Sequence, residues 1–295
     1  MKVLITGVTG LLGSQLARHY AQQGHDVWGL VHTTHPPAEL VRHITPVHTF
    51  TELSGHFDLA INLAGASVAG GRWTAQRKQT LRDSRIGTTK GLLAPLANEQ
   101  YRIDHLISGS AVGYYGSTTE TVTEQASAGA DFGAQMVADW EASALAGQGS
   151  INKITLIRTG LVLSVHGGLL KQLVLPARLC LAARLGSGHQ GQSWIHETDW
   201  VAAVTWLHER GLTGAFNLTT PEPVSQDTFS RTLARQLDRP YWLKVPATPM
   251  RWGLGELADL VLNGQWVVPG RLKEEGFNFT FPDLGSALKD LLGGR

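Results

Sequence analysis

The chain has 295 residues, of which 42% are hydrophobic and 17% are charged, with a formal net charge of +1. This composition excludes a mainly disordered protein, which would combine low hydrophobicity with high charge. The sequence has no long run of Lys or Arg, so nucleic acid is not expected as a partner. Cys180 is the only cysteine, which excludes an intrachain disulfide and a cysteine-based zinc site, and we interpret it as a core residue.

The first ten residues, MKVLITGVTG, lack the long apolar region and the cleavage signal of a secretory peptide. No run in the chain approaches the roughly 18 apolar residues of a membrane span. We therefore expect a cytoplasmic protein that has no membrane partner.

The first half of the chain alternates short apolar runs with stretches of helical spacing. A βαβ unit is expected at the start, with strands at 3–5 and 26–31 around a helix at 11–23. The elements predicted after it are a strand ending at Phe50, a strand at 58–63, a helical stretch within 74–98, a strand at 105–108, a helix at 132–145 and a strand at 154–158. Strands separated by helices predict an α/β fold with a doubly wound parallel (Rossmann) sheet.

After Ser164 the alternation becomes less regular. We expect a buried helix broken by Pro176, a helix capped by Asp199, a strand at 214–219 and a helix capped by Ser225. The predicted organisation is a Rossmann domain over residues 1–165, with a return segment around 190–222, and a smaller C-terminal substrate lobe within 166–295.

Gly7, Gly10 and Gly13 form a Gly-x-x-Gly-x-x-Gly motif between the first predicted strand and the first predicted helix. One glycine permits the tight turn, one lets backbone N–H groups approach a pyrophosphate, and one lets the helix pack closely on the sheet. Because the motif lies at a βα junction, it predicts dinucleotide binding.

The end of the second predicted strand indicates which dinucleotide is bound. An NAD site usually places Asp or Glu there to bind the ribose hydroxyls, but this strand ends Leu-Val-His-Thr-Thr at residues 30–34. His32 can donate to a 2′-phosphate, with Arg42 or Arg85 as further candidates from elsewhere. NADP (NADPH) is therefore the expected cofactor. The nearby histidines have no metal-ligand spacing, and no metal is expected: His32, His35, His43 and His48.

Several further motifs resemble those of extended short-chain dehydrogenases/reductases. Besides the glycine motif, these are NLAG at 62–65, SR at 84–85, SGSAVGYYG at 108–116, RTGLVL at 158–163 and GSGHQGQSWIHETD at 186–199. More narrowly, the chain resembles an atypical NAD(P)-dependent epimerase family protein of the nucleoside-diphosphate-sugar epimerase-like branch. The resemblance covers nearly the whole chain.

The resemblance implies roles for residues outside the glycine motif. Leu63 and Ala64 would pass beneath a ribose of the cofactor, Arg85 would lie near its phosphates, and residues 160–162 would flank the nicotinamide. For Arg85 a solvated helix position is the alternative. The predicted cofactor-binding residues are Thr6, Gly7, Thr9, Gly10, Leu11, Leu12, Gly13, Val31, His32, Leu63, Ala64, Gly65, Arg85, Gly160, Leu161 and Val162.

Trp194 and His196 are the predicted substrate contacts, because this segment borders the substrate lobe in similar reductases. A structural hydrogen bond is the equal alternative for His196. Asn62 is likewise open between a contact to the cofactor and a residue that satisfies backbone groups at the strand end. For Asp199 we favour the helix cap over a catalytic role.

The Tyr-x-x-x-Lys pair that active members of the superfamily use for proton transfer is missing. The matching positions on the predicted helix at 132–145 are Gly133 and Val137, or Phe132 and Met136 if the alignment slips by one residue. None of these side chains can move a proton.

Ser110, Tyr114 and Tyr115 are the remaining catalytic candidates, since they follow a strand near its carboxyl end, where ligands bind in such sheets. Ser110 would polarise a substrate oxygen. For the two tyrosines, positioning of the substrate is favoured over general acid catalysis, because an unperturbed phenol has a pKa of about 10 and has no neighbouring lysine in the sequence.

Two functions fit these observations. One is an NADP-dependent oxidoreductase or epimerase that acts on a nucleotide sugar or another small hydroxyl or carbonyl compound. The other is a non-catalytic or weakly catalytic NADP(H)-binding protein that senses redox state or regulates a partner. A homodimer through residues 80–96 and 132–145 would follow from the resemblance, because related reductases often pair through such helices.

Overall fold

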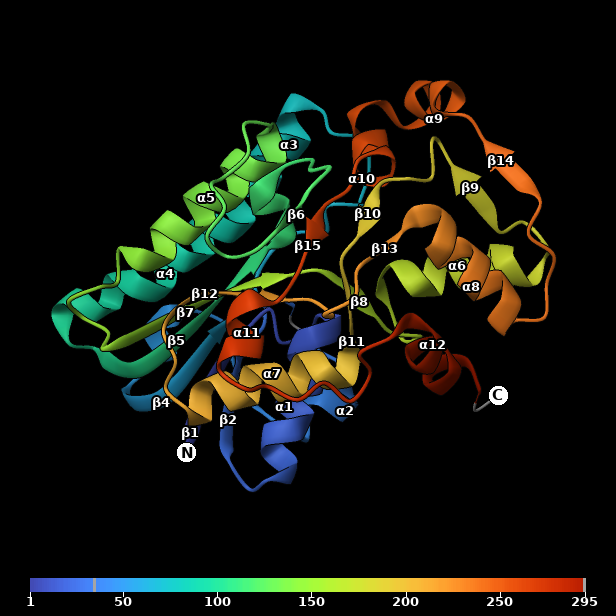
Figure 1. The fold of residues 1–295 in the computed structure, drawn as a ribbon. Coiled ribbons are helices and arrows are strands. Elements are labelled where there is room, and N and C mark those ends of the chain that lie inside the picture. Colours follow the sequence, from blue (N-terminus) through green and yellow to red (C-terminus); the bar gives the residue numbers. More distant parts are fainter. Residues whose placement is uncertain (34–35, 294–295) are drawn as a thin grey trace.

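A seven-stranded sheet forms the centre of the computed structural model, which describes residues 1–33 and 36–293 (Figure 1). Its strand order is β12-β7-β5-β4-β1-β2-β3, and each neighbouring pair is parallel. The strands are β1 (Lys2–Thr6), β2 (Asp26–Leu30), β3 (Thr45–Val47), β4 (Gly55–Asn62), β5 (Tyr101–Ala111), β7 (Lys153–Thr159) and β12 (Gly214–Leu218). The predicted doubly wound sheet is confirmed. The strand order reverses at β1, so the carboxyl ends of β1 and β4 mark the place where such sheets bind ligands.

Helices cover both faces of this sheet. Apolar residues of α1 (Leu11–Gln22), α7 (Glu197–Glu209) and α11 (Gly270–Glu274) pack in one buried cluster with strand residues such as Val3, Ile5 and Leu59. On the other face, α4 (Thr88–Leu93) and α5 (Phe132–Leu145) contribute Leu92 and Ala144 to a second cluster with Leu4 and Leu106. Short α2 (Ala38–Val41) lies near the β2–β3 edge, where Leu40 joins the first cluster.

Several elements differ in length from the prediction. The stretch within 74–98 is not one regular helix but a series of α3 (Ala75–Arg82), a π-helical segment (Asp83–Gly87), α4 and a 3-10 segment (Ala94–Asn98). β3 ends at Val47, and Phe50 instead begins a 3-10 turn (Phe50–Glu52). In contrast, α5 has the predicted bounds.

The C-terminal half adds a lobe beside the sheet (Figure 1). Its core contains Trp194, Leu170, Phe229 and Leu288, which come from β11, α6, α8 and α12. The helices of this half, besides α7 and α11, are α6 (Gly168–Arg178), α8 (Gln226–Gln236), α9 (Ala247–Leu254), α10 (Asp259–Leu262) and α12 (Leu284–Gly293). The predicted boundary at residue 165 stays a prediction.

Four pairs of short strands lie outside the central sheet. Three are parallel, and the pair of β10 with β13 is antiparallel. They are β8 (Leu161–Leu163) with β11 (Trp194–His196), β6 (Thr121–Val122) with β15 (Trp266–Val267), β9 (Ala183–Leu185) with β14 (Leu243–Val245), and β10 (Gly191–Gln192) with β13 (Val224–Ser225). Within residues 1–33 and 36–293, no helix is long and apolar enough to cross a bilayer.

Candidate functional site

The loop between β1 and α1 needs glycine at two positions for steric reasons. Gly7 has φ of +68°, and a Cβ atom there would lie 2.7 Å from the backbone of Leu63. A Cβ atom on Gly13 would lie 2.3 Å from the carbonyl oxygen of Gly7. Side chains at these positions would push α1 away from the strand ends.

The N-terminus of α1 is open toward this loop. Gly10 is its N-cap residue and offers no side-chain hydrogen bond, and the first turn carries no acidic residue. The amide groups of this turn and the positive end of the helix dipole therefore suit an anion. Thr9 is exposed there, and Leu11 and Leu12 are half-buried.

Thr6 and Asn62 tie the ends of β1 and β4 together. The Thr6 hydroxyl donates to Asn62 Oδ1 at 2.6 Å and accepts from the amide of Ala64 at 3.2 Å. Asn62 also donates to Thr89 Oγ1 at 2.8 Å. Both Thr6 and Asn62 are fully buried, so their side chains hold the strand ends in place. These hydrogen bonds give both side chains a structural role, and the predicted contact of Thr6 with the cofactor stays a prediction.

The turn after β2 presents His32 to solvent. Val31 is fully buried and its side chain belongs to the core, and its predicted contact with the cofactor stays a prediction. His32 and Thr33 are exposed, and neither is acidic. Thr34 of this turn and His35 of the histidine group lie outside the described residues.

Arg85 lies against the loop that follows β4. A Cβ atom on Gly65 would lie 3.1 Å from Arg85 Cζ. The guanidinium donates to the carbonyl oxygen of Leu81 at 3.1 Å and lies 5.4 Å from the centre of the Trp140 ring. Burial and the charge of Arg77 lower the pKa of Arg85 to about 10. Arg85 is therefore half-buried beside the loop and is not a freely solvated helix residue.

Ser110 belongs to a buried polar network. Its hydroxyl donates to Glu141 Oε1 at 2.5 Å. The same carboxylate receives two hydrogen bonds from Arg158, each 2.8 Å long. All three residues are 5% exposed. With its proton committed to Glu141, Ser110 does not donate to a substrate in this structure, so the geometry does not support its predicted catalytic role.

Tyr115 continues this network. Its hydroxyl accepts from Arg158 Nη1 at 2.9 Å and donates to Asn217 Oδ1 at 2.7 Å. Burial raises the pKa of Tyr115 despite the opposing effect of Arg158. A buried phenol with both hydrogen bonds made inside the protein is a structural residue, which corrects its predicted role in the site.

Tyr114 differs from Tyr115 in its surroundings. It is half-buried, and within the described ranges its hydroxyl has no hydrogen-bond partner. Its ring lies 3.5 Å from Arg158 Cζ and meets the Tyr115 ring edge-on. Of the three predicted catalytic residues, Tyr114 alone keeps a hydroxyl free of bonds within the described chain.

The start of α5 carries no side chain that could replace the tyrosine and lysine of the missing Tyr-x-x-x-Lys pair. Gly133 has no side chain, and Val137 is 3% exposed. If the alignment is shifted by one residue, the matching positions are Phe132, which packs on Trp73, and Met136, which is buried. Neither side chain can transfer a proton. Of the two acids on this helix, Glu141 faces Ser110 and Arg158, and Asp139 pairs with Arg82 at the surface.

Residues 160–162 lie beside the segment that leads to β11. A Cβ atom on Gly160 would lie 2.3 Å from the carbonyl oxygen of Ser193, and the amide of Leu161 donates to that oxygen at 2.8 Å. Leu161 and Val162 are half-buried. This close approach explains the glycine but leaves the predicted contact to the nicotinamide untested.

Trp194 and His196 are both buried, which corrects their predicted contact with substrate. Trp194 is fully buried in the core of the C-terminal lobe. His196 is 1% exposed and is the N-cap residue of α7, where its Nδ1 accepts from the amide of Thr198 at 3.1 Å. Asp199 is not the cap. Its carboxylate accepts from the amides of Thr280 and Phe281 and so fixes the chain before α12.

Sequence reasoning missed one group of metal-ligand type. His56, Asp58 and Asp104 place their ligating atoms within 4.8 Å of one another, on β4 and β5 near the amino ends of these strands. His56 and Asp104 already form a 2.8 Å ion pair at the surface. None of the histidines named in the sequence analysis belongs to this group.

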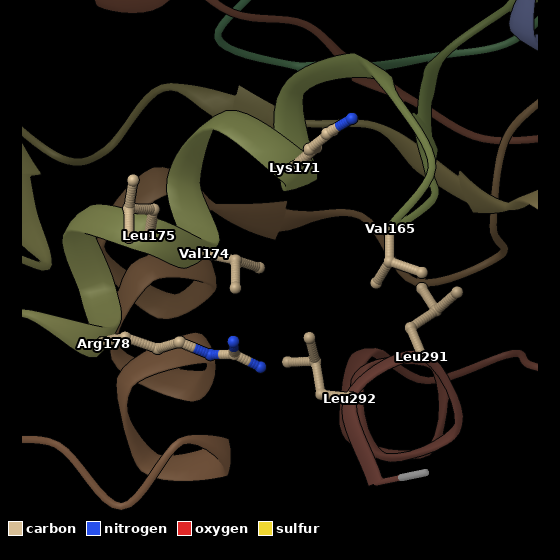
Figure 2. Close-up of a pocket in the computed structure, with 7 residues that line it drawn as sticks. All are labelled: Val165, Lys171, Val174, Leu175, Arg178, Leu291 and Leu292. Carbon is tan, nitrogen blue, oxygen red and sulfur yellow. The ribbon is translucent and has the colours of Figure 1, made fainter. Parts of the chain in front are cut away.

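A cavity of about 160 Å³ lies between α6 and α12 (Figure 2). Val174 and Leu292 point toward each other across it, and Arg178 reaches toward Leu292. Lys171 is the other charged residue of its wall. None of the predicted site residues lines it.

Residues 3–218 match the NAD dependent epimerase/dehydratase family, and residues 245–291 match a domain of unknown function, DUF1731. The chain belongs to the NAD dependent epimerase/dehydratase family. It is an extended short-chain dehydrogenase/reductase, as its motifs indicated.

Relatives match along nearly the whole chain. Epimerase family protein Mb2239 of Mycobacterium bovis is 38% identical over 97% of this chain and 96% of that protein. Epimerase family protein YfhF of Bacillus subtilis is 33% identical over 100% of this chain and 99% of that protein. The crystal structure of human epimerase family protein SDR39U1 (isoform 2) with NADPH has a TM-score of 0.91 at 28% identity and covers 100% of both chains.

The residues present fit a nicotinamide dinucleotide. The uncapped N-terminus of α1 meets the ends of β1 and β4, where only glycine fits at positions 7 and 13. The family and the Rossmann fold support NAD(P) binding there.

Proposed function

We propose that this protein binds NADPH and transfers hydride between it and a small hydroxyl or carbonyl compound, with nucleotide sugars as the first class to test. The observation that carries the proposal is the glycine loop against the open N-terminus of α1. Support for NADPH comes from human SDR39U1, whose structure was solved with it. Support for a nucleotide sugar is weaker, because MoeE5, solved with UDP-glucose and NAD, is only 17% identical and shows the fold alone.

The turn after β2 favours NADP over NAD in this proposal. Exposed His32 stands where NAD-binding proteins usually carry an acid, and an acid would repel a 2′-phosphate. The same position lets the imidazole donate a hydrogen bond to that phosphate.

Each group of this chain has a distinct task in the proposed reaction. A nicotinamide cofactor at the glycine loop would supply or accept the hydride. The buried network of Ser110, Glu141 and Arg158 fixes the end of β5, and Tyr114, held over the Arg158 guanidinium, contacts the substrate oxygen and exchanges the proton.

A direct experiment first identifies any nucleotide that the purified protein retains, by mass spectrometry. Nicotinamide absorbance is then followed while nucleotide sugars and small carbonyl compounds are screened. Tyr114→Phe should lower turnover by about 100-fold, the lower range for loss of an acid-base group, and leave the Kd for NADPH unchanged. Tyr241→Phe, which removes a hydroxyl bound to Asp227 in the C-terminal lobe, is the matched control.

Tight NADPH binding without turnover of any compound would contradict the enzymatic proposal. That result would favour the second function, an NADP(H)-binding protein that senses redox state or regulates a partner.

A further inference from the structure

The cavity of about 160 Å³ between α6 and α12 has a mainly apolar wall (Figure 2). Four of its residues belong to the core of the C-terminal lobe or pack against it: Val165, Val174, Leu291 and Leu292. Leu175 is 64% exposed and adds apolar surface on the solvent side. Such a wall offers water few hydrogen bonds, and apolar cavities of about 150 Å³ bind molecules of the size of benzene. The space therefore suits the apolar part of a small ligand.

Arg178 brings a positive charge to this apolar space. Its side chain reaches from α6 toward Leu292 on the facing helix (Figure 2). Within residues 1–33 and 36–293, no carboxylate lies within 4.0 Å of the guanidinium, and the guanidinium donates no hydrogen bond. None of the seven described residues that line the cavity is acidic. The N–H groups of Arg178 are therefore available to an anion.

The two cations nearest to Arg178 have other partners. Lys171 Nζ lies 3.4 Å from the carbonyl oxygen of His166, and its ammonium group points away from Leu292 (Figure 2). Arg239 Nε donates to the backbone carbonyl oxygen of Arg178 at 2.9 Å, which fixes the end of α6. Of the two cations that line the cavity, Lys171 therefore adds positive potential at the rim, and Arg178 is the one placed for a direct contact.

We infer that this cavity binds a small apolar molecule that ends in a single carboxylate. The carboxylate would lie on Arg178, because two parallel N–H groups of a guanidinium match the two carboxylate oxygens. The apolar part would lie between Val174 and Leu292, where its burial removes apolar surface from water. A phosphate ester would bring a second negative charge to a wall with one such guanidinium, so a carboxylate matches the charge better. None of the predicted cofactor or substrate residues lines the cavity, so binding there does not depend on the proposed function.

The test measures binding of para-fluorobenzoate to the full chain by fluorine NMR, with NADPH present so that the glycine loop is not offered as a second site. The same titration with para-fluorobenzylammonium reverses the charge of the probe, and acetate removes its apolar part. Size-exclusion chromatography of each protein sample reports whether two copies of the chain associate.

The variants separate the charge from the space. Arg178→Gln removes the charge, Arg178→Lys keeps it without the paired N–H groups, and Val174→Phe fills the cavity toward Leu292. Arg235→Gln is the matched control, since Arg235 is an exposed arginine of α8 that does not line the cavity. Thermal unfolding shows which variants are folded. Because Arg178 is exposed, Arg178→Gln keeps the test valid if Val174→Phe does not fold.

The wild type should bind para-fluorobenzoate in a saturable one-to-one manner. Arg178→Gln should raise the Kd by about tenfold or more, the effect of losing a charged hydrogen-bond partner, and Arg178→Lys should raise it less. Val174→Phe should abolish binding, and Arg235→Gln should leave the Kd within twofold of the wild type. The benzylammonium probe and acetate should each bind at least tenfold more weakly than the benzoate.

Several results would overturn the inference. They are no saturable binding by the wild type, a Kd within twofold of the wild type in Arg178→Gln, an equal loss in Arg235→Gln, or equal binding of the benzylammonium probe. A wild-type dimer that Val174→Phe converts to a monomer would also overturn it, because the cavity would then belong to a contact between two copies of the chain. Because the titration needs no hydride transfer, these results stand apart from a failure of the proposed activity.

Discussion

Arg158 on β7 and Glu141 on α5 form a two-point ion pair inside the protein. The Nε–Oε1 and Nη2–Oε2 distances are both 2.8 Å, and both residues are 5% exposed. Burial opposes the charge on Arg158, but the hydrogen bonds and charge of Glu141 raise the pKa of the guanidinium overall. Glu141 lies on the helix where similar reductases carry their tyrosine and lysine, so this helix contributes to a structural ion pair here.

Removal of one partner of this ion pair should destabilise the protein strongly. Glu141→Gln would leave Arg158 charged and unpaired in the interior, and we expect the free energy of unfolding to fall by about 3 to 5 kcal/mol. Urea denaturation measures this. Asp139→Asn, which breaks the exposed ion pair with Arg82, should cost less than about 1 kcal/mol. If both variants lose the same free energy of unfolding, the pair of Glu141 and Arg158 does not behave as a buried ion pair.

Ser110→Ala should affect stability more than cofactor binding. The variant removes a hydrogen bond to a buried carboxylate, which is worth about 1.5 to 3 kcal/mol, and leaves the glycine loop intact. Denaturation and NADPH titration of the same preparation check both parts. If unfolding is unchanged and the Kd for NADPH rises, Ser110 contacts the cofactor and its structural role is wrong.

His32→Asp should shift the cofactor preference toward NAD. The new carboxylate would repel a 2′-phosphate and could accept from a ribose 2′-hydroxyl. We expect the ratio of the Kd values for NADPH and NADH to rise by about tenfold, the effect of roughly 1.4 kcal/mol. Thr33→Ser is a conservative control in the same turn. An unchanged ratio would show that this turn does not select the cofactor.

Acid should destabilise the protein through His105. Burial, with smaller effects of His208 and Lys153, lowers the pKa of His105 to about 4 from its ordinary 6.5. The unfolded chain therefore binds the proton first, and the stability that this histidine contributes is complete above about pH 6.5 and is lost as the pH falls toward 4.

The loss should amount to about 3 kcal/mol over that interval, measured as the free energy of unfolding in urea at several pH values. His105→Gln keeps a polar group beside Thr155 and His208 but cannot titrate, so its curve should be flatter. An identical pH dependence in the variant would assign the effect to other groups.

The fold was largely predictable because its signals are local. The apolar runs of β1 and β4 and the helical spacing of 132–145 each fall within a few consecutive residues, and they appear as expected. Asp199 failed as the predicted cap because a histidine three residues earlier takes that place, and sequence position alone does not show which side chain faces the free amides.

The site was less predictable because its partners are distant in sequence. Ser110 and Tyr115 are typical of an active site, and only the fold brings Glu141, Arg158 and Asn217 to them. One signal was present, since Arg158 interrupts the apolar run ITLIRTG, and a charge in a buried strand needs a partner. Nothing in the sequence showed which acid that partner is.

A fluorescence titration of NADPH into the nucleotide-free protein measures whether the loop from Gly7 to Gly13 binds this cofactor. The wild type should bind in a saturable one-to-one manner. Gly13→Ala should lose this binding because its Cβ would lie 2.3 Å from the Gly7 carbonyl oxygen, whereas Gly253→Ala, whose Cβ meets no atom within 4 Å, should keep it. Absence of binding by the wild type, or equal binding by a folded Gly13→Ala, would show that the glycine loop is not the NADPH site.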